Sequence, residues 1–280
     1  MYELKVQNKY GQELDLTNNL NYTITSIDGL EPPDATINTT KIATADGSVF
    51  NSAFLENRQI IITMAINYPA EQNRINLYNY FKAKFPMTVY YRNGERNVKI
   101  NGYLQKLQIA FFDMKQTAQA TIICNNPYFE DLSPKSTVIS KVQSNFEFPF
   151  AIEETIPFSE ITTESSIIQN NSDFEIGAIF RIHAFGTISN PIITNNTTNE
   201  YFGVNVTLNA GDEVVINTRT GEKSVYKNIN GTKTNAIADV NSGSTWLQLA
   251  PFANDFSLSF TGNDDACYCE CEIIQQYEGV

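Results

Sequence analysis

The stretch NPIITNNTTNEYFGVNVTLNAGDEVVINTRTGEKSVY, residues 190–226, decides the fold class. Between Val204 and Leu208 apolar and polar side chains alternate, as on a strand with one buried face. Turn sequences follow at residues 210–212 (AGD) and 220–222 (TGE), between short runs rich in β-branched residues. No helix of useful length fits. We expect antiparallel β structure that presents a surface and does not enclose a cofactor.

The length of 280 residues is large for a single core and predicts two domains. A hydrophobic content of 42%, with 18 Phe and 14 Tyr, is enough apolar material for two cores. Polar sequence containing Pro134 lies between Leu132 and Asn145 and is typical of a crossing between domains. We therefore predict one domain over residues 1–133 and a second over residues 134–280.

In the first domain we predict strands with one inserted helix. Pro69 precedes the helix, which we expect near residues 70–85, and Pro86 ends it. Its apolar residues recur at helical spacing and can be read as an interaction surface or as the face that covers a sheet; the second reading is favoured. The stripe consists of Ile75, Tyr78, Phe81 and Phe85. Strands are expected at 59–67, 87–91, 97–107 and 116–124.

Charge divides unevenly along the chain, whose net charge is −12. Residues 1–133 hold 12 Lys and Arg against 13 Asp and Glu, a net charge of −1, and the remainder holds 7 against 18, a net charge of −11. A near-neutral domain can pack against copies of itself, whereas the acidic one should stay hydrated and repel polyanions. We expect no sequence-specific nucleic-acid binding and no membrane span. Because the start lacks a signal-like apolar run, we expect synthesis in a cytoplasm.

The four cysteines do not suggest a disulfide framework. On a strand, Cys267, Cys269 and Cys271 would share one face. A metal site is the alternative reading, but the paired C-x₂-C spacing is missing and the sequence holds a single histidine. We favour buried, reduced thiols and predict no metal site.

Groups suited to catalysis are scarce. The single histidine, His183, follows a strand pattern on whose polar face it lies with Arg181, which favours a surface or interface role. No nucleotide-binding or nucleophile-elbow motif is present. The acidic pairs Glu153-Glu154 and Asp264-Asp265 are neighbours in sequence, and neighbours on a strand point to opposite faces. We predict no catalytic residue, no cofactor and no enzymatic activity.

Carbohydrate binding is the more serious rival function. Lectins use an aromatic plane beside polar groups, and Trp246 lies in the run STWLQL. The alternation of this run leaves the orientation of the indole open. A tryptophan in the core or at its rim is favoured over a sugar-binding one.

Several segments resemble, in their order, the distal tail proteins of siphophages that infect Gram-positive bacteria. In the first half these segments are Ile27–Leu30, Ala45–Ser48, Asn57-Arg58, the helix, and Cys124 with Asn126–Phe129. In the second half they are Ser189–Ile193, Gly211–Thr218, Thr220–Lys223, Trp246-Leu247, Leu249, Pro251 and Asn254.

The resemblance implies a β-barrel-like first domain that forms a hexameric ring and a galectin-like β-sandwich as the second. It implies a virion protein of the tail tip or baseplate, from a phage or a related prophage and assembled in the host cytoplasm. It would join the tail tube protein to the tail-tip protein and, in some phages, to receptor-binding proteins. We therefore expect a structural hub; the alternative is a carbohydrate-binding module for host recognition.

Overall fold

The chain divides into two compact units. The computed structural model describes residues 2–44, 46–113, 115–139, 142–144, 159–161, 166–263 and 266–280. Unit 1 comprises Met1–Leu132 and Gln276–Val280, and unit 2 comprises Ser133–Gln275. The chain thus leaves unit 1 after Leu132 and returns to it for its last five residues, which we call the return segment. Domain limits at 133 and 134, with their expected roles, stay a prediction.

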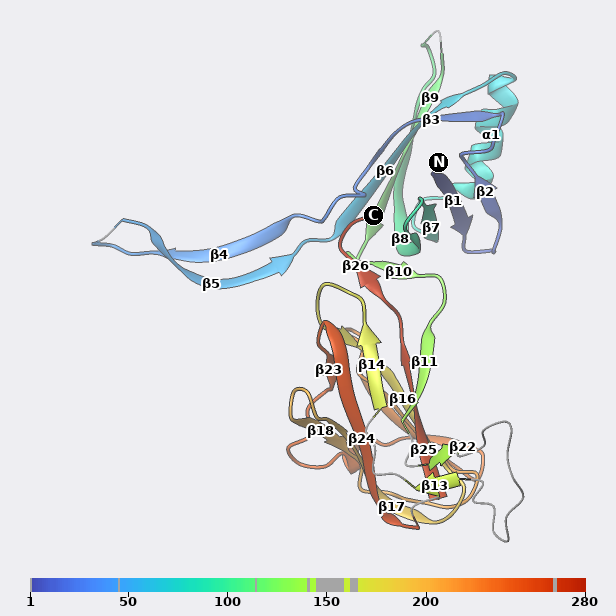
Figure 1. The fold of residues 1–280 in the computed structure, drawn as a ribbon. Coiled ribbons are helices and arrows are strands. Elements are labelled where there is room, and N and C mark those ends of the chain that lie inside the picture. Colours follow the sequence, from blue (N-terminus) through green and yellow to red (C-terminus); the bar gives the residue numbers. More distant parts are fainter. Residues whose placement is uncertain are drawn as a thin grey trace. The chain divides into compact units, whose positions relative to one another are not determined.

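Unit 1 is built on an antiparallel sheet with the strand order β2-β1-β7-β8-β9-β6-β3 (Figure 1). Strand β10 pairs with β8 and with β26, which belongs to the return segment. This path ends at β2 and β3, so the described strands form no closed barrel, which corrects the barrel-like form that we expected. The bounds are β1 Glu3–Asn8, β2 Glu13–Asp15, β3 Tyr22–Asp28, β6 Arg58–Ile66, β7 Pro86–Arg92, β8 Asn97–Ala110, β9 Thr117–Cys124, β10 Phe129–Asp131 and β26 Gln276–Tyr277.

Helix α1 (Ala70–Tyr80) lies where it was predicted but ends five residues earlier. The backbone N–H of Lys84 donates to the carbonyl of Leu104, and the N–H of Leu104 donates to the carbonyl of Phe85. Pairing with β8 therefore replaces the last helical turn that the sequence pattern suggested. No helix of the described residues has the length and apolar content that a membrane crossing requires.

The predicted stripe of α1 is only partly buried. The helix contacts the sheet through Leu77, with Phe81 just beyond its end, and both side chains belong to the core of unit 1. Ile75 and Tyr78 are exposed instead. The helix covers the sheet as favoured, but with a face rotated from the one that the spacing indicated.

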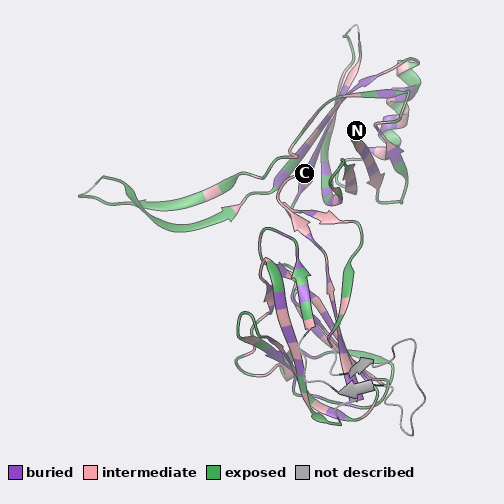
Figure 2. Ribbon diagram, viewed as in Figure 1, coloured by how far each residue is buried: buried purple, intermediate pink, exposed green. Residues whose placement is uncertain are grey.

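Strands β4 (Ala35–Lys41) and β5 (Ser48–Leu55) form a separate two-stranded hairpin, which we call the ribbon. They pair only with each other (Figure 1). Every residue of the two strands is exposed except Thr36 and Leu55, which are half-buried (Figure 2). The ribbon therefore contributes almost nothing to the core of its own unit.

Unit 2 contains two larger antiparallel sheets. One has the order β11-β25-β16-β20-β21-β22, and the other has the order β14-β24-β17-β18 with β19 beside β17. Pairs β15-β23 and β12-β13 complete the described strands. The bounds are β11 Lys135–Ile139, β12 Val142–Ser144, β13 Ser159–Ile161, β14 Ser166–Asn170, β15 Ile176–Gly177, β16 Ile179–Ala184, β17 Ile188–Asn195, β18 Glu200–Gly203, β19 Thr207–Leu208, β20 Glu213–Asn217, β21 Ser224–Ile229, β22 Thr232–Asn235, the 3₁₀ turn η1 Ile237–Asp239, β23 Gln248–Leu249, β24 Phe252–Gly262 and β25 Cys267–Ile273.

The core of unit 2 lies between these two sheets, as in a β-sandwich. Phe180 of β16 and Phe256 of β24 meet with ring centroids 5.5 Å apart, and both are fully buried. Burial alternates along β16 and β25, because successive side chains point to opposite faces of a strand. The mainly β class, with one helix and a sandwich, is confirmed.

The opening stretch of sequence is antiparallel β as predicted, but its middle is broken. Val204 and Leu208 are fully buried, yet the regular strand there covers only Thr207–Leu208. The N–H of Asn205 donates to the carbonyl of Asp239, in η1. A hydrogen bond to a neighbouring turn therefore takes the place of one rung of the ladder, while the alternation of burial is kept.

Candidate interaction surfaces

The ribbon presents large apolar side chains to solvent. Ile37 and Phe50 are 64% and 63% exposed, and pairing puts them on the same face, with Ala35, Ala53 and Leu55. The opposite face carries side-chain hydrogen bonds, from Asn38 to Ser52 (3.1 Å), from Asn51 to Thr40 (2.7 Å), and from Thr36 to Glu56, together with Phe54 and Val49. Between residues 35 and 55 the only charges are Lys41 and Asp46. Since a lone hairpin is marginally stable in water, this nearly uncharged ribbon is suited to packing against another surface.

A second group of exposed apolar side chains gathers at one end of the sheet, and we call it the apolar end. Leu20, Tyr68 and Phe112 are almost fully exposed, and Phe111 is half-exposed. The loops that carry them are joined, because the side chain of Asn67 donates to the carbonyl of Leu20 at 2.8 Å. The guanidinium of Arg74, on α1, lies 4.9 Å from the centre of the Phe111 ring. The apolar end therefore combines the β2–β3 turn, the loop before α1 and the β8–β9 hairpin.

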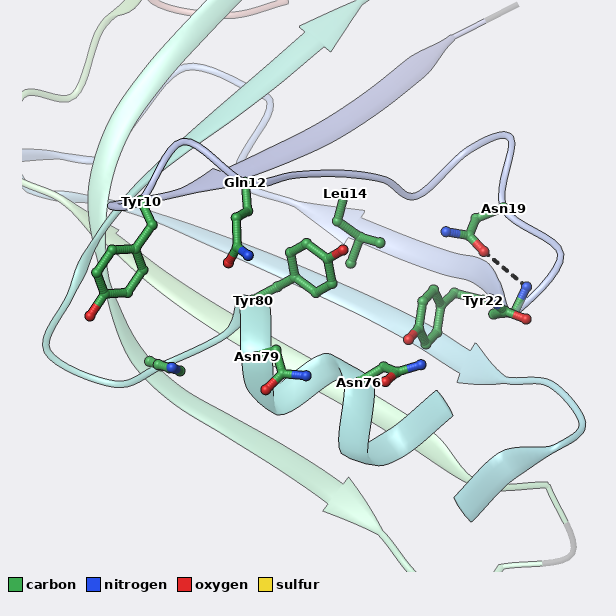
Figure 3. A pocket seen from close by; sticks show the side chains of 10 residues that line it. Tyr10, Gln12, Leu14, Asn19, Tyr22, Asn76, Asn79 and Tyr80 are labelled. Atoms are coloured by element: carbon green, nitrogen blue, oxygen red, sulfur yellow. Dashed lines mark hydrogen bonds between the residues drawn. The ribbon is translucent and has the colours of Figure 1, made fainter. Parts of the chain in front are cut away.

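A polar groove of about 660 Å³ lies between α1 and the β1–β2 region (Figure 3). Amide and phenol groups dominate its lining, and Lys82 supplies the only charge. Tyr22 is held in place by donating its hydroxyl proton to the carbonyl of Asn73 at 2.9 Å. The lining contains no carboxylate, His, Cys, Ser or Thr side chain, and its amide, phenol and ammonium groups can form hydrogen bonds with a bound group. The lining residues are Tyr10, Gln12, Leu14, Asn19, Asn21, Tyr22, Asn76, Asn79, Tyr80 and Lys82.

Trp246 lies half-buried at the rim of the unit 2 core. Its ring packs against Phe202, with centroids 5.1 Å apart, and the Lys223 ammonium lies 5.7 Å from its centre. The indole is therefore partly occupied by contacts within the unit. Sugar binding at Trp246 stays a prediction.

His183 belongs to a polar face of unit 2. Its Nε2 atom lies 3.9 Å from a carboxylate oxygen of Glu213 and 4.0 Å from one of Glu270, and its ring stacks on Tyr268. The same sheet face holds Glu272, which accepts hydrogen bonds from Arg181 at 2.8 Å and Arg219 at 3.1 Å. Glu272 is thus engaged with both arginines as in a surface ion-pair network, while Glu213 and Glu270 lie beside His183. The acidic pairs Glu153-Glu154 and Asp264-Asp265 lie outside the described residues.

The cysteines are free and buried, and the three of β25 share one face as predicted. Burial raises the pKa of the Cys269 and Cys271 thiols well above the usual range and that of Cys124 to about 12. They are therefore protonated at neutral pH and poorly reactive. In the part of the chain that the structure describes, no group of three or more His, Cys, Asp or Glu side chains could hold a metal ion.

This fold is shared with known proteins of phage tails. Residues 171–272, within unit 2, match the model of the family described as siphovirus-type tail component, C-terminal domain. The solved structure of SPP1 Dit, a hub adsorption protein of Gram-positive infecting phages, matches 98% of this chain and 98% of its own, with a TM-score of 0.68 and 15% identity. Residues 171–272 are thus similar to the C-terminal domain of siphovirus-type tail components, and the chain as a whole shares the fold of SPP1 Dit.

Chains of the phage P2 baseplate in its activated conformation also share the fold. With Ca the TM-score is 0.53 at 11% identity, and with Sr it is 0.52 at 12% identity; both matches cover 100% of each chain. At such identities the likeness concerns the fold. No curated protein matches the chain.

Sequence reasoning missed both apolar surfaces. The ribbon had a signal in the alternating β-branched and aromatic residues on either side of Asp46-Gly47, which form a turn. The apolar end had one in Phe111-Phe112 beside Asp113, since adjacent aromatic residues at a turn cannot both enter one core.

Proposed function

We propose that the protein is a structural hub of a phage tail tip, which forms a ring by placing its ribbon on the neighbouring copy. The exposed, nearly uncharged ribbon is the observation that carries this proposal. Such a segment gains stability only when a partner covers its apolar side chains. Another unit 1 is a suitable partner, because that half of the chain is close to neutral and offers little repulsion.

The apolar end supports a second joint, along the tail. A fully exposed aromatic side chain on a hairpin, such as Phe112, is suited to insertion into a neighbouring protein. We assign this end to contact with the tail tube protein or the tail-tip protein. The strongly acidic second half would remain hydrated, with receptor-binding proteins as its candidate partners. We expect the ring to be a hexamer in the virion tail. The role of the protein is structural, and we expect it to catalyse no reaction.

Assembly of tails in host cells would test the ring. A variant with Ile37→Asn and Phe50→Asn should fold but leave tails without an assembled hub ring, as seen by electron microscopy. The matched control is Ile167→Asn with Phe252→Asn, two exposed apolar residues of unit 2. Normal rings from the ribbon variant would overturn the proposal.

The carbohydrate-binding alternative has its own measurement. Titration of cell-wall polysaccharide can be followed through the fluorescence of Trp246, the only tryptophan of the chain. Under the hub proposal no saturable change is expected. Saturable binding that is lost in Trp246→Ala would favour host-glycan recognition instead.

A further inference from the structure

Arg58, at the start of β6, is a buried cation whose hydrogen bonds go to main-chain carbonyls. It is 2% exposed. Its Nε donates to Pro127 at 2.6 Å, its Nη1 donates to both Gly29 and Glu31 at 2.6 Å, and its Nη2 donates to Glu278. Its guanidinium also lies 4.6 Å from the centre of the Phe129 ring. A buried charge is costly unless its donors are satisfied, so these carbonyls must be held where they are.

The carbonyls come from three separate segments that meet at the base of the ribbon. Gly29 and Glu31 belong to the link between β3 and β4, and Arg58 itself is the third residue after the end of β5. The backbone N–H of Glu56 donates to the carbonyl of Asp34 at 3.0 Å and closes the base. Arg58 thus connects both ends of the ribbon with the return segment.

The return segment is also held from its other side. Arg96 donates to the carbonyl of Gly279, and its guanidinium lies 4.2 Å from the centre of the Tyr277 ring. The N–H of Val280 donates to the carbonyl of Leu30 at 3.1 Å, on the link that enters the ribbon. Tyr277 pairs with Phe129 in the β10–β26 ladder.

Two glycines allow the close approach that this arrangement needs. A Cβ atom at Gly29, whose φ is +89°, would lie 2.1 Å from the carbonyl oxygen of Gln59. A Cβ atom at Gly279 would lie 3.1 Å from Cδ of Pro32 and 3.4 Å from the carbonyl oxygen of Leu30. A side chain at Gly29 would collide with the backbone of β6, and a side chain at Gly279 would require Pro32 or the link into the ribbon to shift by a few tenths of an ångström.

We propose that Arg58 and the return segment Gln276–Val280 position the ribbon by fixing its base. The ribbon itself is exposed almost throughout, so its direction is set by residues 29–34 and 56–58 and by what holds them. The consequence for assembly rests on the proposed function. In a ring, the return segment would set the direction in which the ribbon extends toward the neighbouring copy.

The test measures the ribbon in single subunits, before any ring forms. Spin labels are attached at Ser48→Cys, on the ribbon, and Gln105→Cys, on β8, and the distance distribution between them is recorded by double electron–electron resonance. The native thiols are buried and stay unlabelled. The parent should give one narrow distribution. Gly279→Val should widen it at least twofold, while the melting temperature of the sheet changes by only a few degrees.

Gly94→Val is the matched control, because a Cβ atom there would meet nothing within 4 Å. It should leave the distribution unchanged. Arg96→Gln is a milder second variant, which removes the donor to Gly279 and should widen the distribution less. If Gly279→Val fails to fold, Arg96→Gln decides the question.

An unchanged distribution in the folded variants, or a parent distribution as broad as theirs, would overturn the positioning role. The ring is tested separately by electron microscopy. A narrow parent distribution that widens in the Gly279→Val or Arg96→Gln variant supports positioning whether or not rings form, and normal rings from the ribbon variant refute only the ring contact.

Discussion

Unit 2 hides its large apolar side chains, whereas unit 1 leaves many of them in water. Among the described residues, fifteen exposed large apolar side chains lie in unit 1 and six in unit 2. Both units nevertheless have a full core, built around Leu77 and Ile60 in the first and around Phe180 and Phe256 in the second. The exposed apolar side chains of unit 1 are therefore present in addition to a complete core and do not result from a missing part of that core.

The comparison shows where the partners of this protein should bind. A soluble subunit keeps exposed apolar patches small, so the ribbon and the apolar end indicate surfaces that other chains cover. Charge points in the same direction, since the neutral half carries these surfaces and the acidic half does not. Under the proposed function, assembly would cover the apolar side chains that unit 1 leaves exposed.

The sharpest challenge to this contrast is a pair of Phe→Ala substitutions. Phe180→Ala should lower the free energy of unfolding of unit 2 by about 3–5 kcal/mol, because it leaves a cavity against Phe256. Phe50→Ala in the ribbon should change that of the isolated subunit by less than about 0.5 kcal/mol. Urea unfolding, followed by Trp246 fluorescence for unit 2 and by hydrogen exchange for unit 1, measures both. A loss of more than about 2 kcal/mol from Phe50→Ala would mean that the ribbon packs within its own subunit.

A polar atom introduced into the β25 face would show how dry the core of unit 2 is. Cys269→Ser should cost about 1–3 kcal/mol, because the hydroxyl is more strongly hydrated than the thiol it replaces and is fully buried. Cys269→Ala is the matched control and should cost less. Trp246 fluorescence during urea unfolding provides the measurement. Equal stability of the Ser variant and the parent would indicate a polar or hydrated site.

Alkaline pH should weaken unit 1 through a buried tyrosine. Burial raises the pKa of Tyr22 to about 12, from an ordinary value near 10. The folded state therefore keeps this proton over a range in which the unfolded chain loses it. Its contribution is complete below about pH 10 and falls away toward pH 12, by about 1 kcal/mol at pH 11.

The Tyr22→Phe variant isolates this contribution. Its free energy of unfolding, measured by urea titration with hydrogen-exchange detection, should fall less steeply above pH 10 than that of the parent. Tyr10→Phe, at an exposed tyrosine, is the matched control. Identical slopes for all three proteins would rule out a buried phenol that resists ionisation.

The smallest effect is expected on the polar face of unit 2. Glu272→Gln should cost about 0.5–1 kcal/mol, since the bonds to Arg181 and Arg219 lie close to solvent. The cost should shrink at high salt. Exposed Glu175→Gln is the control, and urea unfolding at two salt concentrations is the measurement. A salt-independent loss of several kcal/mol would place these charges in the core instead of on its surface.

Local pattern was enough to predict much of unit 2. The C-x-C-x-C spacing predicts that all three thiols of β25 share a face, and alternation predicts that Phe180 and Ile182 point inward while Arg181 and His183 point outward. These are consequences of strand geometry alone, which needs no knowledge of the partner strands. The strands of unit 1 at 87–91, 97–107 and 116–124 were found for the same reason.

Long-range pairing explains what could not be predicted. Residues after Tyr80 have a helical spacing but pair with β8, and only the fold brings Leu104 next to Phe85. The acceptors of Arg58 are backbone carbonyls, which carry no sequence signature. The ribbon's separation from the sheet was equally hidden, because an exposed hairpin and a buried one can share the same alternation.

The return segment has a consequence for engineering and for evolution. Glu130 and Gln276 are direct partners in the β10–β26 ladder, so unit 2 is an insertion whose entry and exit are neighbours. A domain with adjacent ends can be exchanged as a cassette without disturbing the sheet that receives it. Proteins built in this way could replace the whole inserted module while the sheet that receives it keeps its sequence.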